Sequence, residues 1–267
     1  MESSSIPDKK KRNIIIAVGV VICVIIAVVA IVVATGRRDN SSTNSGSQAT
    51  AVRDVDRTKL PPEFDYGEWL IYKGMPVFAP DGETRPTLPQ LGKRTWSTPK
   101  PYQTFARPLN PIFIVVEKQA LVQLSSTDGP TKSRNGFYGG YAHSLQGAAL
   151  AAINSEASML SCGPTQAEAT KQYAGQSLTI PCSHPETPFP TIPSFVRLRE
   201  VHGDVLEFEL AYDKGDPEQL SVEKVVVEWT DGDWHASAGW FREGLKTSYR
   251  EDRSNFSGDG WILWSEM

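Results

Sequence analysis

The sequence predicts an α+β protein that carries an N-terminal transmembrane helix. Three observations lead to this expectation: an uninterrupted apolar run at residues 14–34, a helical pattern at residues 144–174, and alternation of polar and apolar residues after Pro193. A helical hairpin followed by antiparallel strands is typical of α+β folds, in which helices cover one face of a sheet. The expected order is a basic cytoplasmic tail (1–13), the transmembrane helix (14–34), a flexible linker (35–60), a Pro- and aromatic-rich arm (61–111) and an extracytoplasmic α+β domain (112–267).

Residues 14–34 are almost entirely Ile, Val and Ala and carry no charge. At about 1.5 Å per residue this run spans about 30 Å, the thickness of the hydrocarbon core of a bilayer. A buried core helix would show a polar face, which this run lacks. A cleaved signal peptide has a shorter apolar region and a small-x-small cleavage site, which Val32-Val33-Ala34 matches poorly. We therefore expect an uncleaved anchor that contacts the lipid bilayer through residues 14–34.

Charge predicts the orientation of the anchor. Lys9, Lys10, Lys11 and Arg12 precede the apolar run, and only Arg37 and Arg38 follow it closely. The positive-inside rule then favours a cytoplasmic N-terminus, with the rest of the chain outside the cell membrane. The formal net charge of −4 argues against a nucleic-acid partner, because phosphate neutralisation requires a basic surface.

Two different segments connect the anchor to the domain. Residues 39–50 are small and polar, which predicts a flexible tether. Residues 61–111 combine recurring prolines with aromatic residues, and proline disfavours long helices and central strands. We expect an irregular arm whose aromatic side chains pack on the domain behind it; a Pro-rich ligand for a partner module is the alternative.

The domain begins with short apolar runs at residues 112–116 and 120–124, which predict two strands. A Gly-rich turn follows, and Ser144 is a candidate N-cap for a helix that continues to Leu160. One stripe of that helix is rich in Gly and Ala, so another element can approach it closely. A second helix is expected from Pro164, at the first helical position, to a stop at Gly175.

After Pro193 the sequence predicts an antiparallel meander. Residues 195–201 and 204–212 flank His202-Gly203, and residues 222–229 and 233–237 flank Asp231-Gly232, a dipeptide suited to a type I′ turn. Glu207, Glu209 and Glu223 alternate with apolar residues, so we interpret them as side chains on a solvated face. The segment after Trp240 is expected to be a closing strand or a docking tail.

The chain contains three cysteines. Cys23 lies inside the apolar run. Cys162 follows the first predicted helix and Cys182 the second, so a disulfide between Cys162 and Cys182 would tie the helical hairpin at its base and stabilise it by about 3 kcal/mol. An extracytoplasmic location permits this bond, and two free buried thiols are the alternative.

The sequence contains no catalytic, cofactor-binding or metal-binding motif. His143, His184, His202 and His235 form no HxH or HExxH spacing, and no G-x-S-x-G elbow or phosphate-binding loop is present. His143 precedes the predicted first helix, where it is expected to be a neighbour of the cap or to line a pocket. His202 and His235 lie in or beside hairpin turns and are expected to be exposed. We therefore expect no catalytic residue, no cofactor and no metal.

Two stretches resemble a known but uncharacterised family. Residues 140–154 follow G-Y-A-H-S-x-x-G-A-x-L-A-A-x-N, and residues 227–234 follow V-x-W-x-D-G-D-W. Both are similar to actinobacterial exported or membrane-anchored proteins associated with integrative conjugative elements, in which G-[FY]-A-H-[ST]-P-x-G-A opens a helix. Leu145 replaces the usual proline. The resemblance covers about residues 105–240.

The resemblance implies a cone-like fold similar to nuclear transport factor, with a helical hairpin packed on a curved antiparallel sheet. The same fold serves as the periplasmic assembly domain of type IV secretion and conjugation machinery. Three functions follow as hypotheses: a scaffold or assembly component that binds itself or other envelope proteins, a module that binds a small ligand or cell-wall fragment, and an enzyme that uses a perturbed acid–base pair with His143. The scaffold fits best.

Overall fold

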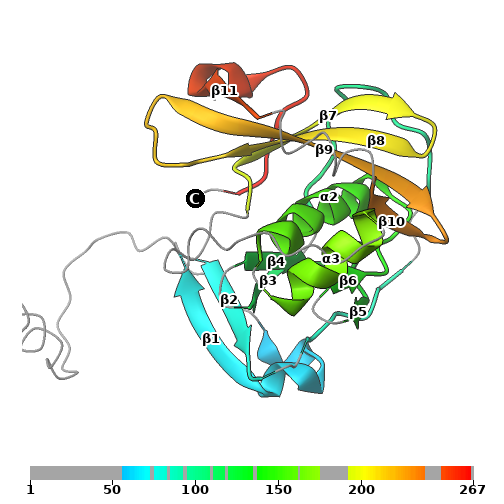
Figure 1. Cartoon of the computed structure of the whole chain (residues 1–267), viewed down its shortest axis with the longest axis vertical. Coiled ribbons are helices and arrows are strands. Elements are labelled where there is room, and N and C mark those ends of the chain that lie inside the picture. Colours follow the sequence, from blue (N-terminus) through cyan, green and yellow to red (C-terminus); the bar gives the residue numbers. More distant parts are fainter. Residues whose placement is uncertain are drawn as a thin grey trace, which may run out of the picture. The chain divides into compact units, whose positions relative to one another are not determined.

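The computed structural model describes residues 56–72, 75–82, 85–92, 95–108, 111–117, 120–134, 137–161, 163–174, 192–237 and 248–265. Within these residues the chain forms α-helices and mostly antiparallel sheets, so the predicted α+β class is confirmed (Figure 1). Residues from Thr50 to Met267 belong to one compact unit.

The first sheet contains four strands in sequential order: β1 (Gly67–Tyr72), β2 (Met75–Pro80), β3 (Ile112–Val116) and β4 (Ala120–Leu124). The strands β3 and β4 occupy the two apolar runs predicted from the sequence and pair antiparallel. The pairing of β2 with β3 is parallel and covers only Val77 with Phe113 and Phe78 with Ile114.

The Pro-rich arm is not irregular throughout, because its first part forms β1 and β2. The prolines are tolerated because of their register: Pro76 lies opposite Ile71 and Pro80 opposite Gly67. The hydrogen bonds between β1 and β2 run through the alternate residues, so β2 needs no N–H from either proline there. The described residues 85–92 and 95–108 follow without regular structure, and the side chains of Trp96 and Phe105 pack against the main core, as expected for the arm.

The second sheet has the order β10-β9-β8-β7-β12, and β11 also pairs with β9. Its strands are β7 (Phe195–His202), β8 (Val205–Tyr212), β9 (Gln219–Thr230), β10 (Asp233–Ala236), β11 (Tyr249–Asp252) and β12 (Ile262–Leu263). The predicted meander is therefore confirmed, and both Asp231 and Gly232 have the positive φ angles of a type I′ turn. The strand β12 pairs with β7, so the C-terminal segment closes this sheet.

The predicted helical hairpin is present as α2 (Leu145–Leu160) and α3 (Pro164–Ala174). Ser144 is the N-cap of α2, since its side-chain oxygen accepts a hydrogen bond from the Gly147 N–H at 2.9 Å. A small two-stranded ribbon, β5 (Lys132–Arg134) with β6 (Phe137–Gly139), precedes α2.

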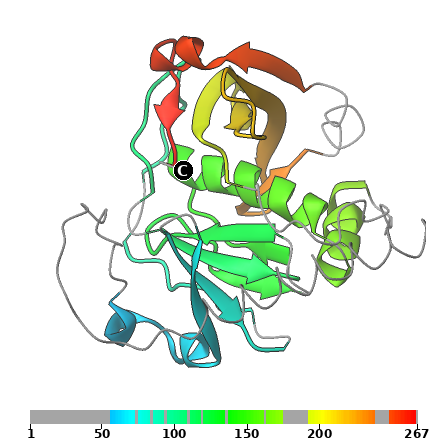
Figure 2. The same ribbon diagram turned by 90° about the vertical axis from the view of Figure 1, so that its left-hand side faces the viewer.

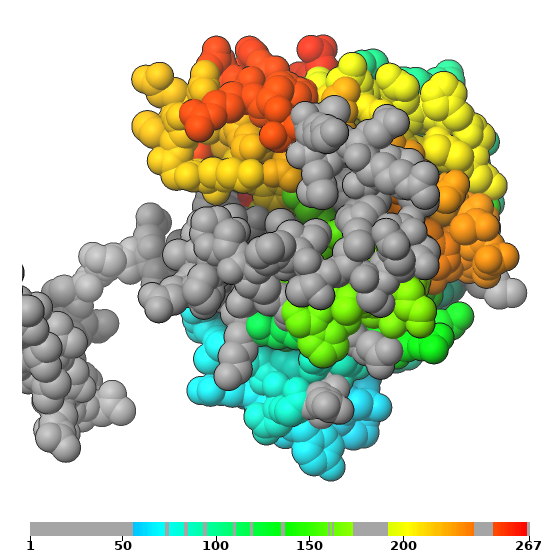
Figure 3. Space-filling view, in the orientation of Figure 1, coloured from blue at the N-terminus to red at the C-terminus, as the bar shows by residue number. Residues whose placement is uncertain are grey.

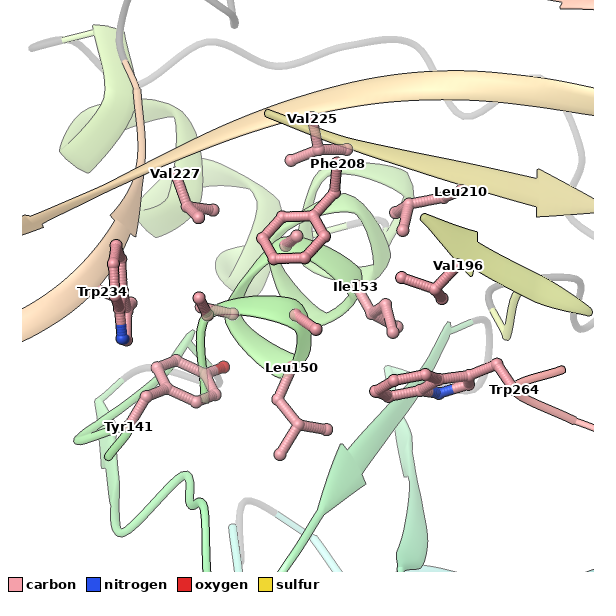
Figure 4. Packing of buried hydrophobic residues seen from close by; sticks show 14 of the residues in the cluster. Tyr141, Leu150, Ile153, Val196, Phe208, Leu210, Val225, Val227, Trp234 and Trp264 are labelled. Carbon is pink, nitrogen blue, oxygen red and sulfur yellow. The ribbon is translucent and has the colours of Figure 1, made fainter. Parts of the chain in front are cut away.

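The helix α2 lies between the two sheets, which differs from a hairpin on one face of a single sheet. It packs on β4 on one side and on β8, β9 and β10 on the other (Figures 1 and 2). The Ala and Gly residues of α2 explain this position, because small residues on several faces of a helix let elements approach from more than one direction. Figure 4 shows Phe208, Val225 and Val227 facing α2 from the sheet, with Leu150 on the opposite side of the helix.

Several predicted features lie outside the described residues: the tail, the transmembrane helix at 14–34, most of the linker, and both cysteines of the predicted disulfide, Cys162 and Cys182. Of the helices that the structure does describe, none combines the length and apolar character needed to cross a bilayer. The end of the predicted linker is ordered, since Arg57–Lys59 form a 3-10 turn and Leu60 packs on the first sheet.

Candidate functional site

The two stretches that carry the family resemblance meet at the N-terminal end of α2. The Asp233 carboxylate of β10 accepts hydrogen bonds from the backbone N–H groups of Gly140 and Tyr141, the latter at 2.8 Å. The Trp234 indole donates to the Ala142 carbonyl at 3.0 Å. These three bonds hold the tip of the second sheet against the chain that enters α2.

His143 lies in a stack of aromatic rings at this junction. Its imidazole is sandwiched between Trp96, at 4.5 Å between ring centres, and Trp229, at 4.0 Å, and both pairs are nearly parallel. Trp234 meets Trp96 and Trp229 edge-on. His143 Nε2 lies 3.7 Å from the Asp204 carboxylate, beyond hydrogen-bond distance, and 29 % of the side chain is exposed. Both faces of the ring are therefore covered and only an edge reaches solvent.

The turn that begins α2 is packed tightly around its cap. The Ser144 hydroxyl donates to the buried Asp128 carboxylate at 3.0 Å while it accepts from Gly147. A Cβ on Gly147 would lie 2.2 Å from the Ala142 carbonyl oxygen, so only glycine fits there. The Ser144 hydroxyl and the Gly147 N–H are thus used in internal contacts.

A cavity of about 390 Å³ lies beside this turn. Trp96, Pro99 and Phe105 of the arm form one wall, and Ser144, Leu145 and Gln146 of α2 form another. The cavity has the size of a small-ligand site. His143 does not line this cavity; it lies directly before the Ser144 cap, between the Trp96 and Trp229 rings.

Asn154, the last residue of the first stretch, binds the edge of the first sheet. Its Oδ1 accepts from the Gln123 N–H and its Nδ2 donates to the Gln123 carbonyl, both at 2.8 Å, so the amide pairs with β4 as a neighbouring strand would. The Nδ2 group also donates to the Tyr141 hydroxyl at 3.1 Å. The Gln123 side chain accepts from the Trp264 indole at 2.7 Å, which ties the C-terminal segment to the same place.

A pair of carboxyl groups joins α2 to the second sheet. Burial raises the pKa of Glu156 well above its usual value, and the hydrogen bond with Glu223 raises it further. Burial opposes ionisation of Glu223 as well, but hydrogen bonds from Glu156 and Lys214 outweigh it and lower the pKa of Glu223. The Tyr212 hydroxyl donates to Glu156. Glu156 is therefore the protonated partner and Glu223 the ionised one, and Lys214 Nζ lies 2.6 Å from Glu223.

Glu223 and Glu209 are not on a solvated face, so the interpretation from alternation was wrong for both. Glu223 pairs with Leu210, and directly paired residues point to the same side, which here is the side of α2. Glu209 is on the opposite side but is 0 % exposed, because the C-terminal segment covers that face with Phe256 and Trp261. Glu207 is partly exposed, beside Arg199 and Lys224.

Two arginines compensate the buried charge of Glu209. Arg197 donates to Glu209 through Nε at 2.8 Å, and Arg199 donates through a terminal nitrogen at 2.6 Å. Burial of Glu209 favours its neutral form, but these arginines outweigh burial and lower the pKa of Glu209. The Tyr249 hydroxyl donates to the same carboxylate at 3.1 Å, and burial with the nearby negative charge raises the pKa of Tyr249 to about 12.

The other predicted site residues are dispersed. His202 is exposed as expected, His235 is half-buried in β10, and His184 lies outside the described residues, as do Cys162 and Cys182. In the part of the chain that the structure describes, no three His, Cys, Asp or Glu side chains are grouped to hold a metal ion. The aromatic stack and the carboxyl pair were missed from sequence, although the need of the arm's aromatic residues for burial pointed to Trp96.

These features define an α+β domain in which a buried helix lies between two sheets and an aromatic stack closes one end. The chain belongs to the family described as Domain of unknown function (DUF8175), whose model matches residues 91–250. No curated protein and no solved structure matches the chain. The matched segment contains Trp96, His143 and the hairpin of Trp229 and Trp234, whereas β1 and β2 precede it.

Proposed function

We propose that the chain is a membrane-anchored extracytoplasmic scaffold or assembly component of a conjugative-transfer or secretion-like envelope apparatus. It is held in the bilayer by residues 14–34 with its N-terminus in the cytoplasm. It acts through protein–protein contact, with itself or with other envelope proteins, and not through catalysis, a cofactor or a nucleic acid. In this proposal α2 and the second sheet correspond to the cone-like part that the family resemblance implies.

The observation that carries the proposal is the exposed apolar surface of β1. Leu70 and Ile71 are 40 % and 61 % exposed on opposite faces of this edge strand, and Tyr66, directly before it, is 63 % exposed. Apolar side chains exposed along an edge strand are suited to contact with another protein. Figure 3 shows the blue and cyan atoms of this part of the chain at the lower margin of the visible face.

The use of the motif side chains gives further support. Asp233, Trp234 and Asn154 make hydrogen bonds to the backbone of neighbouring elements, and both faces of the His143 ring are covered by indoles. Side chains bound in this way hold elements in place. A domain held together in this way and carrying an apolar edge is suited to assembly, because few of its side chains or loops have to lose conformational freedom when a partner docks.

Crosslinking of the tagged full-length chain in intact cells tests the proposal. We expect covalent products that contain two or more copies of the 29.4 kDa chain, or the chain with other membrane proteins. An unrelated single-pass protein at the same abundance serves as the control. Recovery of the 29.4 kDa monomer alone, under conditions that crosslink a known membrane complex, would contradict the proposal.

The cavity beside α2 favours a second candidate, a module that binds a small ligand or cell-wall fragment. Its volume of about 390 Å³ and its lining, in which Trp96 and Phe105 lie among Thr, Ser and Gln side chains, suit a small polar molecule with one apolar face. Titration with soluble cell-wall fragments would then give a saturable change in tryptophan fluorescence that is lost in Trp96→Phe. No change over the millimolar range would exclude this candidate.

A further inference from the structure

The two edges of the first sheet differ in how their backbone groups are satisfied. At β4 the Asn154 amide pairs with the outward N–H and C=O of Gln123. At the other edge β1 has β2 as its neighbour and no second strand within the described part of the chain. An exposed sheet edge presents a row of free N–H and C=O groups that can template another strand.

The register identifies which groups of β1 face outward. Tyr72 pairs with Met75 across a two-residue loop, so this closing pair is hydrogen-bonded, and bonded pairs then recur at every second residue. The Asp81 N–H donates to the Tyr66 carbonyl at 3.0 Å, in phase with this pattern. Bonds to β2 therefore run through the even-numbered residues. The N–H and C=O groups of Gly67, Trp69 and Ile71 point away from the sheet.

The side chains of β1 do not protect this edge. Native proteins usually protect edge strands with inward-pointing charges, prolines or bulges. In β1 the only charged residue is Glu68, and Leu70 and Ile71 are exposed on opposite faces. An exposed, apolar and regular edge strand is suited to pairing with another strand.

We propose that β1 pairs antiparallel with β1 of a second copy of this chain, which joins two four-stranded sheets into one. This inference rests on the proposed scaffold function and names the partner. A twofold contact needs a self-complementary surface, and β1 has one when Trp69 pairs with Trp69 of the second copy. Ile71 then lies opposite Gly67 of the second copy, which has no side chain to clash with it.

The same register places Glu68 opposite Leu70 of the second copy, so the charged residue does not face its own counterpart. Like charges directly opposite each other in neighbouring strands are destabilising, and this pairing avoids them. A strand edge buries a small area, so the contact is weak between free molecules. Two chains anchored in one bilayer through residues 14–34 would meet at a much higher effective concentration.

Disulfide trapping in membranes tests the register. Full-length chains with different tags carry either Glu68→Cys or Leu70→Cys. In the proposed pairing these positions lie about 4.5 Å apart between Cα atoms, within disulfide range, whereas two copies of either position lie about 7–8 Å apart. We expect mixed disulfides to exceed both same-position products about tenfold. Leu91→Cys, at a site that is 63 % exposed, is the control for random collision.

A pair of charge variants provides the matched comparison. In each of the two symmetry-related pairs, Leu70→Glu places a negative side chain directly across from Glu68 of the second copy. Leu70→Lys places a positive side chain at the same position. We expect the Lys variant to associate about tenfold more strongly than the Glu variant, measured by energy transfer between labelled full-length chains in vesicles. Melting temperature checks that both variants fold, since residue 70 is 40 % exposed.

Ile71→Pro tests the backbone directly, because it removes an N–H that points away from β2 and leaves the bonds to β2 in place. We expect Ile71→Pro to abolish association and Ile71→Val to retain it. Equal amounts of mixed and same-position disulfides, or equal association of the Glu and Lys variants, would overturn the inference. A chain that crosslinks to other envelope proteins but not to itself would overturn it as well, while leaving the proposed function intact.

Discussion

Replacement of Asn154 by leucine should be one of the most destabilising single changes in the domain. Leucine has a similar size but cannot bond to Gln123, so one buried backbone N–H and one buried C=O lose their partners. Each unsatisfied buried group costs about 1–3 kcal/mol, and the added apolar contact recovers part of this. We expect a loss of about 3–4 kcal/mol, which for a domain of this size lowers the melting temperature by roughly 10 °C.

The assay is urea unfolding of the purified chain, followed by circular dichroism. Asn154→Asp provides a pH-dependent comparison. When the introduced carboxyl group is ionised, it accepts from the Gln123 N–H but repels the Gln123 carbonyl oxygen; when it is protonated, its hydroxyl donates to that oxygen. The Asp variant should therefore regain stability as pH falls, and the Leu variant should not. Asn255→Ala, at an exposed site, is the control and should change stability by less than about 0.5 kcal/mol. A loss below about 1 kcal/mol for Asn154→Leu would refute the role assigned to this amide.

Three further predictions concern the stack and the buried acids. His143→Ala removes two stacked contacts worth about 0.5–1.5 kcal/mol each, so it should lower the melting temperature while His143→Phe does so far less; equal effects would contradict the stack. Glu156→Gln should stabilise the chain at pH 7. The raised pKa of Glu156 means that its contribution to stability is fully present below the unfolded pKa of about 4.3 and is lost as pH rises through the folded pKa, whereas glutamine stays neutral at every pH. The gain over wild type, from unfolding at pH 5 to 8, should therefore grow with pH, and a constant difference would count against it. Glu209→Gln should destabilise by about 3 kcal/mol at pH 7. The difference in stability between wild type and Glu209→Gln should narrow at low pH. The lowered pKa of Glu209 contributes stability above about pH 4.3, and this stability is lost as pH falls through the folded pKa. If the stabilities of the two proteins changed in parallel with pH, the ion pairs to Arg197 and Arg199 would be contradicted.

Local patterns predicted several elements well. The runs at residues 112–116 and 120–124 are β3 and β4, Ser144 caps α2, and Asp231-Gly232 makes the turn between β9 and β10. Each of these features depends on a few adjacent residues, so the local sequence is enough to predict the strand, the helix cap or the turn.

The features that escaped prediction depend on partners far away in the sequence. Alternation places Glu209 and Glu223 on defined sides of their strands, but it does not reveal that Glu209 is fully buried and that Glu223 is only 27 % exposed. Proline is incompatible with a strand only at positions where its missing N–H would have to donate a hydrogen bond. Pro76 and Pro80 lie in β2 at positions where no N–H donates to β1, so the proline content of residues 61–111 did not reveal this strand. The partners of His143 come from the arm and from β9, which local patterns do not bring together.

The most direct measurement compares two cysteines that are equally exposed in the single chain. Ile71 is 61 % exposed and Leu91 63 % exposed, and each is replaced by Cys in the full-length protein. A membrane-impermeant maleimide is added to intact cells, and labelling of the native cysteines in the wild-type chain is subtracted. We predict rapid labelling at position 91 and slow labelling at position 71, with equal rates after dilution in detergent. Absence of labelling at both positions would contradict an extracytoplasmic domain, and equal labelling in intact cells would contradict an occupied β1 edge.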